Sequence, residues 1–332
     1  MSEGSSSQAP EGDAPSAPAK RPRSPKRLPG QLFDMPYLLL LAATLCWAGN
    51  VVLGRAVYEF VPPVALGFMR WSLALLILLP FTWRRTLRDW RVIRRSLPAV
   101  LLLSVTGLAA FSTLVYVALN HTVALHGALL QSTIPVLIVL FSFLVFRDTM
   151  TPKQLVGVGL SIVGATIIVG QGNPLALLSI RFNPGDLILM VAFCCYALYS
   201  VFLRKRPQVH PLSFMTVIVA LAALFLLPAF LLELSFGRQP QADLATLASV
   251  LYVACFASLL AYVCFNRGVE LIGANRSGQF IHLIPVFGSL MAVVFLGERL
   301  HWYHGVGVVF TGVGVYLAAF RRVAEPRRSG KG

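Results

Sequence analysis

Ten long apolar runs dominate this sequence and restrict what it can fold into. An apolar run of about 18 or more residues is typical of a helix that crosses a membrane. The runs show no alternation of apolar and polar residues and are too long for the strands of a membrane barrel. They cover 36–58, 62–83, 97–119, 123–146, 154–171, 185–203, 212–233, 244–266, 274–296 and 302–320. The sequence therefore predicts an all-α integral membrane protein with ten transmembrane helices.

The chain also repeats itself at nearly constant spacing. The stretch CWAGNVVLGR at 46–55 returns as CYALYSVFLR at 195–204, and Pro135 returns as Pro285. Each half then contains five helices, and because five is odd, the second half enters the membrane from the opposite side. The halves are predicted to be inverted repeats with a solute site between them near the middle of the membrane.

This pattern divides the chain into five parts. They are a disordered basic tail at 1–35, a first five-helix repeat at 36–171, a polar linker at 172–184, a second repeat at 185–320 and a basic tail at 321–332. The apolar run after the first tail is too long for a cleaved signal peptide and continues into further helices.

The net charge of +15 follows from membrane topology and does not indicate a nucleic-acid partner. Most basic residues fall on one predicted side, in clusters at 20–27, 84–95 and 321–331, the second of which is predicted to be the loop after the second helix. The positive-inside rule places this side, with both termini, in the cytoplasm. We therefore expect a multi-pass protein of the cell membrane that contacts membrane lipid.

The sequence contains no pattern typical of an enzyme. The five cysteines lie within apolar runs without metal-ligand spacing, and neither a Ser-His-Asp grouping nor an HExxH motif is present. We therefore expect no catalytic residues, no metal and no cofactor. Glycines at 157–164 and 305–314 predict close helix packing, either between those two helices or between the protomers of a homodimer, so a monomer and a homodimer both remain open.

Polar and aromatic side chains within the runs are the candidates for a solute cavity, because polar groups in a membrane are costly unless they face other helices or water. The first helix contributes Trp47 and Asn50 on one face, and the sixth contributes Tyr196 and Tyr199. Packing or anchoring at the membrane interface is the alternative role of such aromatic residues.

The fourth and ninth helices carry polar residues just before a proline. These are Gln131 and Ser132 before Pro135, and Gln279 and His282 before Pro285. A proline inside a helix removes a backbone donor, kinks the helix and frees a carbonyl, which predicts helix kinks that offer polar groups to a solute. The alternative is that these side chains only form hydrogen bonds between helices.

Arg70 in the second helix has no counterpart in the seventh and keeps its charge. One hypothesis is that it attracts a solute carboxylate or phosphate, and the other is that it snorkels to the outer interface or donates to carbonyls. Tyr116 and Tyr262, in the matching strings YVALN and YVCFN, are predicted to line the cavity. Asn120 and Asn266, which end these strings, are predicted to cap helices.

Four features together resemble the EamA family of the drug/metabolite transporter superfamily. They are Trp47-Ala48 with Tyr196-Ala197, the arginine in FMRWSLALLILL, the prolines of the fourth and ninth helices, and FLGERL at 295–300. The first half departs from the last motif, because Arg147 and Asp148 replace its Gly-Glu. The resemblance spans about 36–320 and implies a ten-helix secondary transporter, commonly an exporter of metabolites, amino acids or drugs.

We therefore expect a secondary transporter that exports small organic solutes such as amino acids, and not an enzyme. A membrane receptor or scaffold, and a drug-efflux protein without a metabolite role, are the alternatives. No acidic residue lies at mid-depth in the apolar runs, so the sequence identifies no carboxylate proton relay.

Overall fold

The computed structural model of this protein describes residues 32–57, 61–122, 124–173, 183–241, 243–296, 299 and 301–319. Within these ranges every regular element is a helix. Residues 1–31 of the predicted tail at 1–35, the whole predicted tail at 321–332, most of the linker at 172–184, and Gly297 and Glu298 of FLGERL lie outside the described residues.

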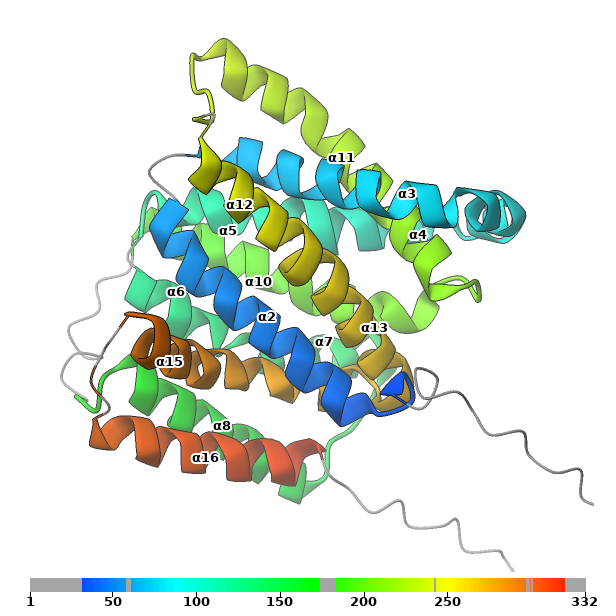
Figure 1. The fold of residues 1–332 in the computed structure, drawn as a ribbon. Coiled ribbons are helices and arrows are strands. Elements are labelled where there is room, and N and C mark those ends of the chain that lie inside the picture. The colour runs from blue at the N-terminus through cyan, green and yellow to red at the C-terminus, as the bar shows by residue number, and fades with distance from the viewer. Residues whose placement is uncertain are drawn as a thin grey trace, which may run out of the picture.

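The first half of the chain forms a sequence of straight and composite helices (Figure 1). They are α2 (Pro36–Val57), α3 (Pro63–Arg95), α4 (Leu97–Ser104), the π-helix η1 (Val105–Ala110), α5 (Phe111–Leu119), α6 (Ala124–Gln131), α7 (Ile134–Phe146) and α8 (Pro152–Val169). The segments α4, η1 and α5 follow one another without a break.

The second half follows a similar order. It contains α10 (Pro184–Phe202), the 3₁₀ turn η2 (Leu203–Lys205), α11 (Pro211–Ser235), α12 (Leu244–Tyr252), the π-helix η3 (Val253–Leu260), α13 (Ala261–Ile272), α14 (Ala274–Gly278), the 3₁₀ turn η4 (Gln279–His282), α15 (Leu283–Leu296) and α16 (Trp302–Ala319). Each half therefore contains one composite helix interrupted by a π-helical segment.

Local sequence explains where several helices start. Thr151 at the start of α8 and Asn183 at the start of α10 each form a capping box, with Gln154 and Asp186 respectively. In such a box two backbone N–H groups that the helix leaves unpaired are satisfied reciprocally. Asn266, by contrast, is not a cap as predicted: it is buried within α13, where it accepts a hydrogen bond from another helix.

The helices pack as a bundle in which distant parts of the sequence are neighbours. In Figure 1, α8 and α16 lie side by side at one edge, α3 and α11 pack at the opposite edge, and α2 crosses between them against α13 and α15. The glycines at 157–164 and 305–314 lie where α8 packs against α16. A Cβ on Gly157 would come within 2.6 Å of the backbone nitrogen of Ala318. Only glycine allows the two backbones to approach this closely.

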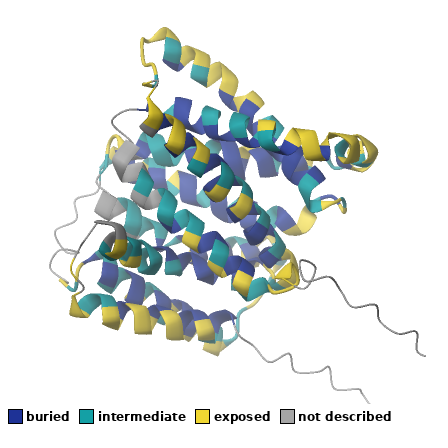
Figure 2. Cartoon of the chain, viewed as in Figure 1, coloured by how far each residue is buried: buried dark blue, intermediate teal, exposed yellow. Residues whose placement is uncertain are grey.

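The outside of the bundle is apolar. Residues such as Leu224 on α11 and Val309 on α16 are 60% and 61% exposed, and exposed faces line the outer helices in Figure 2. Within the described residues, seven helical segments are long and apolar enough to cross a membrane. Exposed apolar surface on this scale is typical of a surface covered by lipid. The protein is therefore an all-helical, multi-pass membrane protein.

The second helix differs from the prediction. The sequence predicts a span at 62–83 followed by a basic loop, whereas α3 continues as helix to Arg95. Arginine is a good helix former, and the basic cluster contains no glycine or proline that would end the helix.

Candidate functional site

An aromatic cluster occupies the centre of the bundle. The ring of Trp47 from α2 lies 5.9 Å from that of Tyr196 in α10 and 5.8 Å from that of Tyr262 in α13, measured between centroids. Tyr199 lies 5.9 Å from both tyrosines. The structure thus brings four of the predicted cavity residues together from three helices, although their rings are closely packed.

The two π-helical segments hold this cluster in place. The Tyr262 hydroxyl donates to the carbonyl of Gly107 in η1 at 2.7 Å, and the Trp47 indole donates to the carbonyl of Ala257 in η3 at 3.0 Å. A π-helical segment departs from regular α-helical pairing and is frequent at functional sites. No sequence signal identified these segments or the side chains from other helices that donate to their carbonyls.

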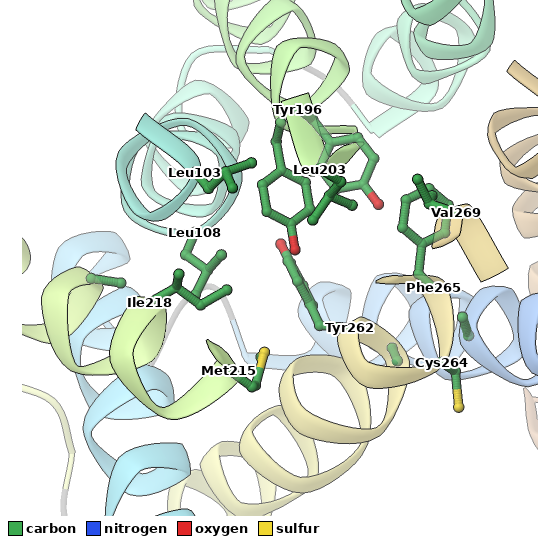
Figure 3. Packing of buried hydrophobic residues seen from close by; sticks show 14 of the residues in the cluster. Leu103, Leu108, Tyr196, Leu203, Met215, Ile218, Tyr262, Cys264, Phe265 and Val269 are labelled. Carbon is green, nitrogen blue, oxygen red and sulfur yellow. The ribbon is translucent and has the colours of Figure 1, made fainter. Parts of the chain in front are cut away.

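One hydroxyl of the cluster has no partner. Tyr196 is only 2% exposed, and its hydroxyl is buried without a hydrogen bond. Figure 3 shows Tyr196 and Tyr262 pointing their hydroxyls toward each other. The other two tyrosines of the cluster are satisfied, since Tyr199 donates to Asn266 at 2.7 Å and Tyr262 donates to η1. Leaving a buried polar group unpaired costs free energy, so the group is a candidate contact for a solute.

Arg70 lies next to this cluster and does not snorkel to an interface. It is 5% exposed, its Nε donates to the Ser258 hydroxyl at 2.8 Å, and its Nη1 donates to the Tyr116 hydroxyl at 3.0 Å. The guanidinium also stacks on Trp71, whose ring is 5.4 Å from that of Tyr262. In the described part of the chain no carboxylate forms an ion pair with Arg70. A buried cation balanced only by hydroxyls and a ring favours an anionic ligand.

The polar residues before Pro135 and those before Pro285, called the two polar collars below, meet each other. The carbonyl of Ser132 accepts a hydrogen bond from Nε2 of His282 at 3.0 Å, and Nδ1 of His282 lies 2.8 Å from the hydroxyl of Ser161 in α8. Because a carbonyl only accepts, Nε2 carries the proton. Gln279 is fully buried and donates to the carbonyl of Asn275, and its own carbonyl oxygen is unpaired.

The prolines mark breaks in both helices. Residues 132–133 separate α6 from α7, and the 3₁₀ turn η4 separates α14 from α15, with Pro135 and Pro285 in the first turn after each break. No hydrogen bond joins the collar residues to Arg70 or the cluster tyrosines in the described structure. These hydrogen bonds therefore join η4 to α8 and to the break between α6 and α7, which is the bundle-holding alternative for these residues. Asn50 lies partly buried one turn beyond Trp47.

A pocket that sequence reasoning missed opens at one end of the bundle. It has a volume of about 710 Å³ and lies between the start of α3 and the ends of α5 and α11. Glu233, which is 7% exposed, lines it and accepts hydrogen bonds from the backbone N–H groups of Val64 at 3.3 Å and Ala65 at 2.7 Å. Its signal in the sequence was an acidic residue within the apolar stretch that ends α11.

Ion pairs close the other end of the bundle. Arg204 after α10 pairs with Asp148 after α7, and Arg267 in α13 pairs with Asp34 at 2.7 Å and with Glu270 at 2.9 Å. Partial burial raises the pKa of Asp148, but hydrogen bonds from Arg204 and Ser142 lower it further, so this pKa lies below its ordinary value. Asp148, which with Arg147 replaces the Gly-Glu of the motif in the first half, thus joins distant segments of the chain.

Comparison with known proteins decides the family. The sequence model of the EamA-like transporter family matches residues 34–170 and again residues 183–320. The chain belongs to the EamA-like transporter family. The predicted resemblance is confirmed, and the family relationship shows a transporter and not an enzyme.

Individual relatives with similar sequences are also described as transporters. The uncharacterized transporter YyaM of Bacillus subtilis is 25% identical over 287 residues, which cover 85% of this chain and 93% of YyaM. A probable amino-acid metabolite efflux pump of Salmonella typhimurium is 26% identical over 298 residues, covering 85% of this chain and 94% of the pump.

The fold itself has a solved counterpart. A crystal structure superposes with a TM-score of 0.71 at 18% identity, covering 85% of this chain and 96% of that one. At this level of identity the likeness concerns the fold. Together these relatives identify a membrane transporter whose helices follow a known arrangement.

Proposed function

We propose that this protein is a secondary transporter that exports small organic metabolites, with amino acids as the substrate class, across the cell membrane. The observation that carries the proposal is the buried Arg70, unpaired by any carboxylate in the described residues, beside an aromatic cluster with one free hydroxyl. A solute carboxylate complements the guanidinium, and an apolar or aromatic side chain complements the rings of Trp47 and Tyr262. A relative described as a probable amino-acid metabolite efflux pump supports this class.

Ten membrane spans in two inverted repeats complete the proposal. Besides the seven long segments, α2 and the interrupted pairs α6–α7 and α14–α15 are apolar and serve as the remaining three spans. An odd number of spans in each repeat reverses the second one, so rocking one repeat against the other exposes the centre alternately to each side. The clusters of arginine at 84–95 and 204–206 then face the cytoplasm with both termini.

The described structure corresponds to one state of this cycle. The pocket lined by Glu233 opens at the outer end, while the Asp148–Arg204 and Asp34–Arg267 pairs close the cytoplasmic end. The central tyrosines pack against one another between these ends, so the solute site opens only when the helices that carry them separate. Alternating access requires such a rearrangement.

The test compares two tyrosines that differ in their hydrogen bonds. Purified protein in proteoliposomes is assayed for counterflow of a panel of labelled amino acids. In Tyr196→Phe the lost hydroxyl has no partner within the protein, so we expect unchanged thermal stability. We expect the KM to rise about 5- to 10-fold, which corresponds to the loss of roughly one hydrogen bond to the solute. In Tyr262→Phe the hydrogen bond to Gly107 is lost, and stability should fall by about 1–2 kcal/mol.

Arg70→Gln tests the charge directly. We expect it to raise the KM for amino acids by about 10- to 100-fold, because hydrogen bonds to charged groups contribute about 1.5–3 kcal/mol. Counterflow of amino acids that is equal in wild type and Arg70→Gln would remove Arg70 from the site. No counterflow of any amino acid in the wild type, with flux of other organic solutes, would contradict the substrate class while leaving transport intact.

A further inference from the structure

The end of α3 extends past the part of the helix that a membrane needs. At about 1.5 Å per residue, the stretch from Pro63 to Pro80 is roughly 27 Å long, close to the roughly 30 Å hydrocarbon core of a bilayer. Residues 81–95, called the α3 arm below, therefore begin at the membrane interface. Pro80 lies inside the helix, where a proline bends the axis. Figure 1 shows α3 changing direction towards its C-terminal end, which projects from the bundle.

The arm is amphipathic. Trp83, Leu87 and Trp90 follow a spacing of four and three residues, which places them on one helix face, and they are 47%, 64% and 45% exposed. Within the described part of the chain, this apolar stripe stays open to the surroundings. Exposed tryptophan is typical of the membrane–water interface, where its ring lies among the lipid headgroups.

A parallel stripe of arginine runs beside the apolar one. Arg84, Arg88, Arg91 and Arg95 follow the same helical spacing, and all four are exposed. Among the described residues none of them pairs with a carboxylate, and the arm carries six arginines against one acidic residue, Asp89. Such a surface is complementary to a dense array of negative charge.

We propose that the α3 arm binds the headgroups of anionic phospholipids in the same membrane. The guanidinium groups bind lipid phosphates, while Trp83, Leu87 and Trp90 insert between the acyl chains at the interface. The arm is continuous with a transmembrane helix, so its ligand lies in the surface on which the arm begins. A nucleic acid or an acidic protein would match the arginines but would leave the apolar stripe without a partner.

This binding acts on the helix that carries Arg70. Since α3 is one continuous helix, fixing the arm at the interface also fixes the depth of Arg70 in the membrane. The inference is independent of the solute, because lipid binding is measured without transport.

The test uses two variants with the same loss of charge. In one, Arg84, Arg88, Arg91 and Arg95 are replaced by Gln. The matched control replaces Arg321, Arg322, Arg327 and Arg328 of the C-terminal tail by Gln. Protein purified in detergent is titrated with phosphatidylglycerol, and with phosphatidylcholine as the uncharged comparison, while bound lipid is measured by native mass spectrometry.

The wild type and the tail variant should bind phosphatidylglycerol equally and at least tenfold more tightly than the arm variant. High salt should weaken this binding, since screening shortens the range of the charges. Equal phosphatidylglycerol binding in both variants would overturn the proposal. So would displacement of the lipid by a short RNA or an acidic peptide at lower concentration, which would assign the arm to that partner.

A fluorescence measurement keeps the proposal testable if the arm variant folds poorly. In the wild type, brominated phosphatidylglycerol should quench tryptophan fluorescence more strongly than brominated phosphatidylcholine does. The double variant Trp83→Phe with Trp90→Phe should lose most of this difference between the two lipids. If the double variant is quenched as strongly as the wild type, the stripe does not enter the interface and the proposal is wrong.

Discussion

Glu233 provides the sharpest test of how this structure is held together. It belongs to α11, but its carboxylate accepts the first free N–H groups of α3, from Val64 at 3.3 Å and Ala65 at 2.7 Å. The residue at the natural capping position is Pro62, whose side chain makes no capping hydrogen bond. The first N–H groups of a helix have no partner within it, so α3 depends on a side chain from another helix.

The cost of losing this cap follows from its geometry. Hydrogen bonds to a charged group contribute about 1.5–3 kcal/mol each, and the positive end of the helix dipole adds to the attraction. Water from the adjoining pocket can replace part of this loss, since Val64 and Glu233 both line that pocket. We therefore expect Glu233→Ala to lower the free energy of unfolding by about 2–3 kcal/mol. Glu233→Gln keeps one acceptor and should lose about 1 kcal/mol.

The assay is thermal unfolding of the purified protein in one fixed lipid mixture. At about 2–4 °C for each kcal/mol in a domain of comparable size, the alanine variant should melt about 4–12 °C below the wild type. Arg238→Ala is the control, because Arg238 lines the same pocket without capping a helix, and it should melt within about 2 °C of the wild type. An alanine variant that melts with the wild type, or a glutamine variant less stable than the alanine variant, would refute the capping argument.

Two further predictions concern helix packing and the ion pairs. Gly164→Ala should destabilise the protein by about 1–3 kcal/mol in thermal unfolding, because the new Cβ would overlap the backbone of Thr311. Gly159→Ala in the same helix is the control: its Cβ would meet nothing within 4 Å, so this variant should be neutral or stabilising. The pKa of Asp148 is lower in the folded protein than in the unfolded chain, so its pair with Arg204 stabilises the fold above about pH 4 and this contribution is lost as the pH falls through the folded pKa. Both side chains are about one-third exposed or more, so the ion pair should contribute at most about 1 kcal/mol to stability. Asp148→Asn should remove this pH-dependent contribution. If the variant unfolds with the same acid dependence as the wild type, the pair does not stabilise the fold.

Much of the local structure was predictable. Long apolar runs predict helices, and the sequence predicts kinks at Pro135 and Pro285; the structure has helix breaks at 132–133 and 279–282, shortly before these prolines. Tyr196, Tyr199 and Tyr262 were expected to line a solute cavity, and the structure buries all three in one packed aromatic cluster. These features depend on helical periodicity and on the proline ring, both of which act within a few residues.

Other features were not predictable from neighbouring residues. The cluster at 84–95 resembled a loop because charge suggests exposure, and exposure does not prevent a helix. Asn266 looked like a helix cap by analogy with Asn120, which does end α5, but α13 continues and Tyr199 donates to its side chain. Glu233 looked like a helix-end residue, and only the packing of α11 against α3 gives it a function.

The sequence by itself determined that the chain forms apolar helices in a duplicated transporter-family arrangement, because in lipid each segment must satisfy its own backbone hydrogen bonds. The tertiary structure alone decided which buried polar groups have partners. Arg70 meets Ser258 and Tyr116, Tyr262 reaches a carbonyl in η1, and the Tyr196 hydroxyl remains unpaired. A hydrogen bond needs two groups within about 3 Å, and the packing of helices distant in sequence brings these groups together.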